Sequence, residues 1–263
     1  MTRDDIQSIR AYLATMAPVH NVAPPPALKW PLNYRVLMRG WDWLFFKPGI
    51  LQPDQQKTPE WNRGRYLVEG PGHCGACHTP KNLFGADRLS RPLGGGLVQD
   101  QFAPRLDEAP RGGLMAEVVR NSTSLMSDAD VRAIAVFLKD MPPGEREPHV
   151  QPPPDTQMAN GEKVYRGSCV ACHEIDGSGS PRIYPPLPGN ANLQSAIAAS
   201  TLRIILDGAQ TLTTPRAPNT GSMPAYAGKL SDEEIADVTT YIRNSWGNSA
   251  SAVTAAQVAK ARK

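Results

Sequence analysis

The chain lacks any apolar run long enough to cross a membrane. Its longest apolar stretch is Trp43–Phe46, far short of the ~18–20 residues that a spanning helix requires. Residues 1–20 carry charges throughout, so they do not show the basic start and apolar core of a secretory signal peptide. The sequence therefore predicts no spanning helix and no export signal within this chain.

An excess of charge of one sign is also absent. The 28 Lys and Arg residues and 25 Asp and Glu residues leave a net charge of +3, and the two signs are interspersed. Nucleic-acid binding needs a concentrated basic surface, so this composition argues against a nucleic-acid partner. The 26 Pro and 22 Gly residues instead indicate small, loop-rich domains that need a disulfide, metal or cofactor to complete their cores.

Cysteine is scarce, and all four copies lie in two short motifs of the form Cys-X-X-Cys-His. In c-type haem attachment, two thiols add across the vinyl groups of the porphyrin, and the next histidine becomes the proximal iron ligand. The sequence thus predicts two covalent haems c. Their attachment residues are Cys74, Cys77 and His78 for the first haem and Cys169, Cys172 and His173 for the second.

Three other uses of these cysteines agree less well with the pattern. Close CxxC pairs would form strained disulfides and leave the histidines unexplained, and no βαβ setting for a thioredoxin-type motif is visible. A zinc site built from two such pairs is the serious alternative. However, zinc does not require a histidine after each pair. With only five histidines in the chain, chance would place a histidine directly after both CxxC pairs about once in a few thousand cases.

A methionine is the expected sixth ligand of the second haem, because a thioether raises the reduction potential and closes the iron to small molecules. Met223 lies in the loop Gly221–Ala225, just ahead of a predicted helix. No other methionine occurs between His173 and the end of the chain. We therefore predict Met223 as the axial ligand opposite His173.

The first haem has three candidate methionines after its histidine. Met115 is preferred because it is predicted to lie in a Gly-rich loop. Met126 adjoins a helix cap that fixes its direction, and Met141 lies beyond the closing helix. The prediction is therefore Met115 opposite His78, with Met126 left as the alternative.

The helix pattern predicts an all-α fold with two tandem cytochrome c-type domains. Each haem motif follows a short predicted helix, about Trp61–Glu69 and about Met158–Tyr165. Each domain should end in another helix. Ser127 caps the first, over Asp128–Lys139, and Ser231 caps the second, with apolar residues at the same offsets from the cap.

The start of the chain repeats the pattern of these closing helices. Thr2 takes the cap position, and Ile6, Ile9, Tyr12 and Leu13 take the apolar offsets. We expect a helix left from a third cytochrome c domain whose haem motif is absent. The expected division is 1–20 for this closing helix, 21–56 for an aromatic and Pro-rich connector, 57–143 for a shortened cytochrome c domain, 144–156 for a linker, 157–248 for a second cytochrome c domain and 249–263 for a C-terminal tail.

The first complete domain is predicted to lack one helix. The second has a predicted helix, about Leu193–Leu206, between its haem motif and its methionine, whereas the first has only Leu106–Gly113 in that place. This difference should leave the first haem more exposed and favour its ferric form.

Longer stretches around the motifs carry a family resemblance. They are Glu60–Gly64, Tyr66–Gly70, Gly72–Pro80, Leu93–Gly96, Met115–Val119, Tyr184–Leu187 and Tyr241–Gly247. Together they cover nearly the whole chain. They resemble the multihaem cytochrome c subunit of bacterial membrane-bound dehydrogenases, of the alcohol, gluconate and aldehyde dehydrogenase type, lacking its first haem domain.

This resemblance implies an electron-transfer subunit whose substrate chemistry takes place on a partner. Such subunits accept electrons from a pyrroloquinoline-quinone or flavin subunit and pass them to ubiquinone or a terminal oxidase. The resemblance also implies axial roles for Met115 and Met223, the periplasmic face of the inner membrane, and a peripheral association with that membrane.

Two other interpretations remain open at this point. A dihaem peroxidase would need an iron with an open or switchable sixth position and a nearby acid–base group, and no residue marks a peroxide site. A non-functional truncated gene product would account for the missing first domain.

Overall fold

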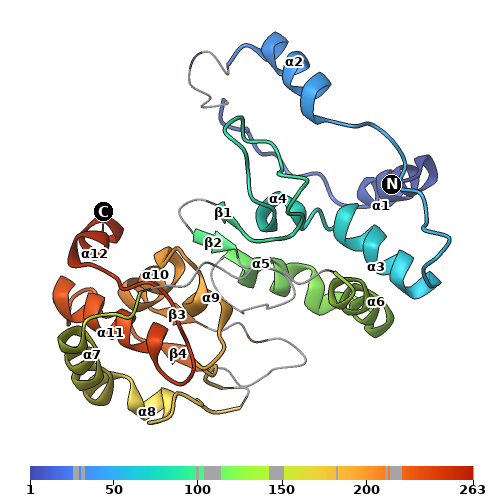
Figure 1. Cartoon of the computed structure of the whole chain (residues 1–263). Helices are drawn as coiled ribbons and strands as arrows, with labels where there is room; N and C mark the ends of the chain where they lie inside the picture. Colours follow the sequence, from blue (N-terminus) through green and yellow to red (C-terminus); the bar gives the residue numbers. More distant parts are fainter. Residues whose placement is uncertain are drawn as a thin grey trace.

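A computed structural model of the chain describes residues 1–25, 30, 33–98, 101–103, 114–141, 151–181, 183–210, 213 and 221–262. The elements up to α6 and those from α7 onward form two groups of helices (Figure 1). The strands described are short. β1 (Gly96–Val98) pairs with β2 (Gln101–Ala103), and β3 (Ala209–Gln210) pairs with β4 (Ser222–Met223), both antiparallel. The prediction of an all-α fold is confirmed.

The first group is built on the crossing of α3 (Pro59–Glu69) and α6 (Asp128–Lys139). Both helices begin at side-chain caps, which satisfy backbone N–H groups that have no partner within the helix. Gly64 lies at the crossing, where a Cβ atom would collide with the Ala133 carbonyl and lie 2.9 Å from Cβ of Phe137. A glycine is therefore what allows these two backbones to touch.

The second group repeats this crossing with α7 (Asp155–Ser168) and α11 (Asp232–Asn244). Gly161 takes the place of Gly64, and a Cβ atom there would collide with the Asp237 carbonyl and lie 2.6 Å from Cβ of Tyr241. Next to this contact, the rings of Tyr165, Tyr241 and Trp246 lie with their centroids 5.1–5.6 Å apart. These aromatic contacts add to the apolar burial that holds α7 on α11.

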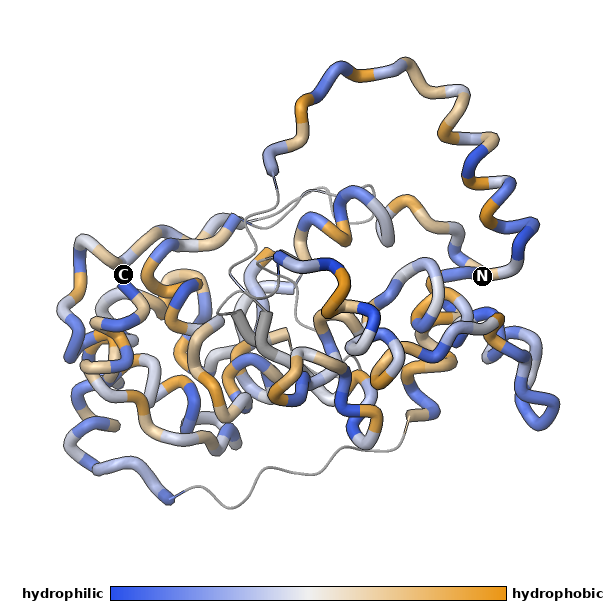
Figure 2. The backbone as a smooth tube through the Cα atoms, turned by 90° about the horizontal axis from the view of Figure 1, so that it is seen from above, coloured by the Kyte–Doolittle hydropathy of each residue, from blue (hydrophilic) through white to orange (hydrophobic). Residues whose placement is uncertain are grey.

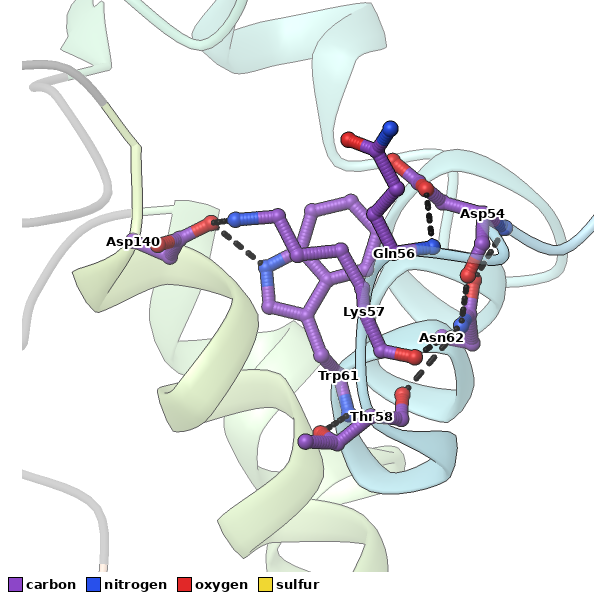
Figure 3. Close-up of polar contacts among 7 residues, drawn as sticks. All are labelled: Asp54, Gln56, Lys57, Thr58, Trp61, Asn62 and Asp140. Atoms are coloured by element: carbon purple, nitrogen blue, oxygen red, sulfur yellow. Dashed lines mark hydrogen bonds and ion pairs between the residues drawn. The ribbon is translucent and has the colours of Figure 1, made fainter.

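A polar network fixes the start of α3 to the end of α6 (Figure 3). The carboxylate of Asp140 accepts a hydrogen bond from Lys57 Nζ at 2.6 Å and another from the Trp61 indole N–H at 2.9 Å. The ammonium group of Lys57 also lies 5.2 Å from the centre of the Trp61 ring. Residues 57–61, at the start of the first domain, are thus tied to its closing helix.

The N-terminal helix α1 (Arg3–Ala14) has the predicted cap, since Thr2 and Asp5 form a reciprocal capping box. Its apolar face is exposed, with Ile6 45% and Tyr12 68% accessible. A hydrogen bond of 2.9 Å from the Tyr66 hydroxyl to the Asp5 carboxylate connects α1 to α3. The apolar face of α1 is therefore largely open to solvent.

The connector contains a helix that we did not predict, α2 (Arg35–Phe45). Trp41 donates its indole N–H to the Phe84 carbonyl at 2.9 Å, and Phe45 stacks on the Phe84 ring at 5.9 Å. Trp43 on the same helix is 84% exposed. One part of the aromatic cluster thus packs on the loop around Phe84, and another part faces solvent.

The remaining helices are shorter. They are α4 (Gly75–His78), α5 (Leu114–Asn121), the 3₁₀ turn η2 (Thr123–Leu125), α8 (Val170–His173), α9 (Ala191–Gln194), α10 (Ala199–Asp207) and α12 (Ala255–Ala261). The residues expected as a C-terminal tail include α12, which packs on α10 and α11.

Hydrophilic and hydrophobic residues alternate along the backbone of both groups (Figure 2). In agreement with this pattern, no helix in the described part of the chain has the length and apolar character to cross a membrane.

Candidate haem sites

Each haem motif forms a one-turn helix that follows a longer helix, after residues 70–74 in the first motif and after Cys169 in the second. In the second domain, the Cys169 N–H donates to the Tyr165 carbonyl at 2.8 Å, and the His173 N–H donates to the Cys169 carbonyl at 3.0 Å. In the first domain, the His78 N–H donates to the Cys74 carbonyl, also at 3.0 Å. Both motifs therefore gather two thiols and an imidazole within one helical turn, as covalent attachment to one porphyrin requires.

Met223 lies on β4, far from α8 in the sequence. It pairs with Ala209 of β3, directly after Gly208. Gly208 adopts a φ of +76°, and a Cβ atom there would lie 2.6 Å from the Met223 carbonyl oxygen. This turn lets the methionine strand run close to the end of α10.

One small cavity brings the predicted ligands of the second site together. Its lining residues are Ser168, Cys169, Cys172, His173, Tyr184, Ser222, Met223, Pro224 and Tyr226. Two thiols, an imidazole and a thioether are the donor set of a His/Met haem c, so the residues fit that group.

The environment of His173 suits a metal ligand. Its Nδ1 is buried. Burial lowers the pKa of His173, and the Pro185 backbone carbonyl acts in the opposite direction. Because the lowered pKa favours neutral imidazole, the ring keeps the lone pair that iron binding needs. Burial likewise raises the pKa of the Cys169 thiol to about 11, with a smaller contribution from Cys172.

Two tyrosines, which the sequence did not predict as site residues, also line the cavity. The Tyr226 hydroxyl donates to the Ser168 carbonyl at 2.6 Å, which connects the methionine segment to the residue before Cys169. The Tyr184 hydroxyl lies by the Cys172 thiol, and its ring lies where a Cβ atom on Gly221 would be. The sequence signal for Tyr184 was its place in the family-like stretch Tyr184–Leu187. The signal for Tyr226 was its place three residues after Met223.

The first site is enclosed mainly around its histidine. His78 is 6% exposed and lies next to the buried Thr79, whereas Cys77 is exposed. The Gly95 N–H donates to the His78 carbonyl at 2.8 Å, so the loop before β1 closes over α4. Burial raises the pKa of the Cys74 thiol, as it does for Cys169.

The predicted loop around Met115 is partly wrong. Met115 is half-buried in the first turn of α5 rather than in a Gly-rich loop, because Leu114–Asn121 has a helix-favouring composition directly after Gly113. The segment 106–113, expected to replace a missing helix, lies outside the described residues. Met141, which follows the closing helix, packs on the apolar cluster that contains Phe137.

A pair of substitutions distinguishes the two remaining methionines. We expect Met115→Ala to lower the reduction potential of the haem at His78 and to open its ferric iron to cyanide, because a thioether favours the ferrous state and blocks the site. Met126→Ala should leave both quantities unchanged. Redox titration and cyanide binding measure them, and the reverse result would transfer the axial role to Met126.

Comparison with known proteins agrees with this geometry. The family described as "Cytochrome c" matches residues 158–246, which include most of α7 and all of α8 and α11. The fold and the second site therefore define a c-type cytochrome.

Several characterised relatives extend the similarity to the whole chain. The cytochrome c subunit of alcohol dehydrogenase (quinone) from Gluconacetobacter polyoxogenes is 35% identical over 312 residues, covering 100% of this chain and 66% of that protein. The gluconate 2-dehydrogenase cytochrome c subunit of Pantoea cypripedii is 33% identical over 99% of this chain and 69% of that protein. The chain belongs to this family of dehydrogenase cytochrome c subunits.

The match to another relative covers a much smaller share of its length. A nicotinate dehydrogenase subunit from Pseudomonas putida is 36% identical over 91% of this chain, but the chain spans 22% of that protein. The chain likewise spans 66% or less of the alcohol dehydrogenase subunits that it matches.

Proposed function

We propose that the chain transfers electrons through two haems c from the catalytic subunit of a quinoprotein or flavoprotein dehydrogenase to ubiquinone or a terminal oxidase. Oxidation of the substrate takes place on the partner subunit. The observation that carries the proposal is the convergence of Cys169, Cys172, His173 and Met223 on one cavity, in a chain of this family. Thiols for attachment and two axial donors serve electron transfer, since a six-coordinate iron leaves no position for a substrate.

The two sites are assigned to two domains, 57–143 and 157–248, joined by the linker 144–156. When bound, the haem iron supplies a one-electron couple. His78 and Met115 would hold the iron of one haem, and His173 and Met223 would hold the iron of the other.

The protein around the second site has three tasks. His173 is kept neutral by burial, so that it can bind iron. Met223 is held by its pairing with Ala209, which limits exchange of the thioether for water. Tyr184 and Tyr226 line the cavity and would exclude water from one edge of the porphyrin, which stabilises the less charged ferrous state.

We place the protein at the periplasmic face of the inner membrane, in peripheral contact with it. The family resemblance supports this location, and so does the attachment of haem through thiols, which takes place after export. A dehydrogenase catalytic subunit is the proposed partner, since the relatives from Gluconacetobacter polyoxogenes and Pantoea cypripedii are named as subunits of such enzymes.

The haem content tests the cofactor assignment. Protein produced with an added export leader, in a host with haem-attachment machinery, should keep its haem after denaturation and give a pyridine haemochrome for two haems per chain. Cys74→Ala with Cys77→Ala should leave one haem. Stoichiometric zinc with no haem in the unsubstituted chain would contradict the assignment.

The same holoprotein tests the proposed electron donor. The catalytic subunit of a quinone alcohol dehydrogenase with ethanol, or of gluconate 2-dehydrogenase with gluconate, should reduce it within a single mixing experiment. The reduced protein should then pass its electrons to a soluble ubiquinone. No reduction by either donor would contradict the proposed partner while leaving the haem assignment intact.

A further inference from the structure

The segment that follows Met223 is held in place along its length. The Tyr226 N–H donates to the Ile205 carbonyl at 3.0 Å, and the Ala227 N–H donates to the Leu206 carbonyl at 3.1 Å. These bonds attach one edge of the segment to the last turn of α10. Its other end continues through Leu230, whose N–H donates to the Tyr226 carbonyl at 3.1 Å, into α11.

Arg262, the residue at the end of the C-terminal helix α12, also contacts this segment. The Arg262 guanidinium donates to the carbonyls of Ala227 and Leu230, the latter at 2.8 Å, and it pairs with the carboxylate of Asp232 in the first turn of α11. One side chain therefore joins the methionine segment to the start of the closing helix. A planar guanidinium can make these three contacts at once, which a lysine ammonium on a flexible stem does less well.

The position of Arg262 is itself well determined by the fold. Val253 and Val258 are 1% and 0% exposed in the apolar core of the domain. Thr254 and Gln257 form a capping box at the start of α12, and the Val253 carbonyl accepts a hydrogen bond from Gln157 of α7 at 2.8 Å. The strap of residues 249–262 is thus anchored independently of the methionine segment.

We propose that Arg262 is a positioning residue for the axial ligand Met223, and that this strap is a functional part of the second haem site. The inference rests on the proposed role of Met223. An iron–thioether bond is weak in the ferric state, so the freedom of the loop contributes directly to the open, ligand-accessible population. By fixing Ala227 and Leu230, Arg262 reduces that freedom. The strap lies beyond residues 158–246, which match the cytochrome c family.

The experiment compares Arg262→Ala and Arg262→Gln with Lys260→Ala in the two-haem protein. Lys260 is exposed on the same helix and carries the same charge, so it serves as the matched control. Hydrogen exchange is measured for the backbone N–H groups of Ser222–Ala227, of which Pro224 has none. Cyanide affinity and the far-red sulfur-to-iron band are measured for the ferric haem at His173. Arg262→Ala removes hydrogen bonds from a charged donor. We therefore expect the exchange rate and the cyanide affinity to rise on the order of tenfold, and the far-red band to weaken.

Three outcomes are decisive. Lys260→Ala should show the same hydrogen exchange, cyanide affinity and far-red band as the unsubstituted protein. Arg262→Gln should give values between those of the unsubstituted protein and those of Arg262→Ala, because the glutamine amide can still donate to one carbonyl. A lower Tm for Arg262→Ala with unchanged exchange, cyanide affinity and band would show a purely structural role and overturn the proposal. An unsubstituted protein that already lacks the far-red band and binds cyanide as Met223→Ala does would refute the Met223 assignment itself, and with it the role of Arg262.

Discussion

Met223→Ala is expected to abolish the far-red sulfur-to-iron band of the haem at His173 and to lower its reduction potential. The reason is that the thioether stabilises the ferrous state and occupies the sixth position. A tenfold change in relative affinity for the two oxidation states corresponds to about 59 mV for one electron, and we expect a fall of at least that size. The ferric iron should also bind cyanide readily. Optical spectra during a redox titration measure all three effects.

Met158→Ala provides the control for this substitution. Met158 belongs to the same domain and is half-buried on α7, but it does not line the cavity of Met223. Its replacement should leave the band and the potential unchanged. If Met223→Ala also leaves them unchanged, the axial ligand is another residue.

Gly161→Ala is expected to destabilise the second domain strongly. The added methyl group would enter the contact between α7 and α11, against the Asp237 carbonyl and the Cβ of Tyr241. Two helix backbones can separate only by giving up the packing around Tyr165. Overpacking of this kind costs about 3 kcal/mol, and for a domain of this size the Tm should fall by more than about 10 °C. Thermal unfolding followed by circular dichroism measures this change.

The matched control is Gly167→Ala on the same helix. Apart from its chain neighbours and the backbone of its own helix, no atom of the described residues lies within 4 Å of a Cβ built on Gly167, so alanine is accommodated there. Since alanine also favours the helix over glycine, this variant should be equal to the unsubstituted protein or slightly more stable. Equal Tm values for Gly161→Ala and Gly167→Ala would refute the close helix contact.

Local patterns in the sequence were sufficient to predict the main helices. The predicted helix Asp128–Lys139 has the bounds observed for α6, and Ser231 caps α11 as expected. These signals work because capping and helical periodicity depend on residues only three or four positions apart. The same holds for each Cys-X-X-Cys-His motif, whose donors occupy a single turn. The helix α2 was missed because its aromatic residues were interpreted as part of an irregular connector.

Contacts between distant segments were decided by the tertiary structure alone. The hydrogen bond from Tyr226 to Ser168 spans 58 positions, and that from Arg262 to Ala227 spans 35. In both bonds the acceptor is a backbone carbonyl, which any residue could provide. The sequence therefore contains no motif that marks Tyr226 or Arg262. By itself, the sequence determined the closing helices and the helical class of the protein, and it predicted the candidate haem donors. Only the folded chain decided which side chains enclose Met223, because backbone partners leave no signal in the identity of the residue that accepts the bond.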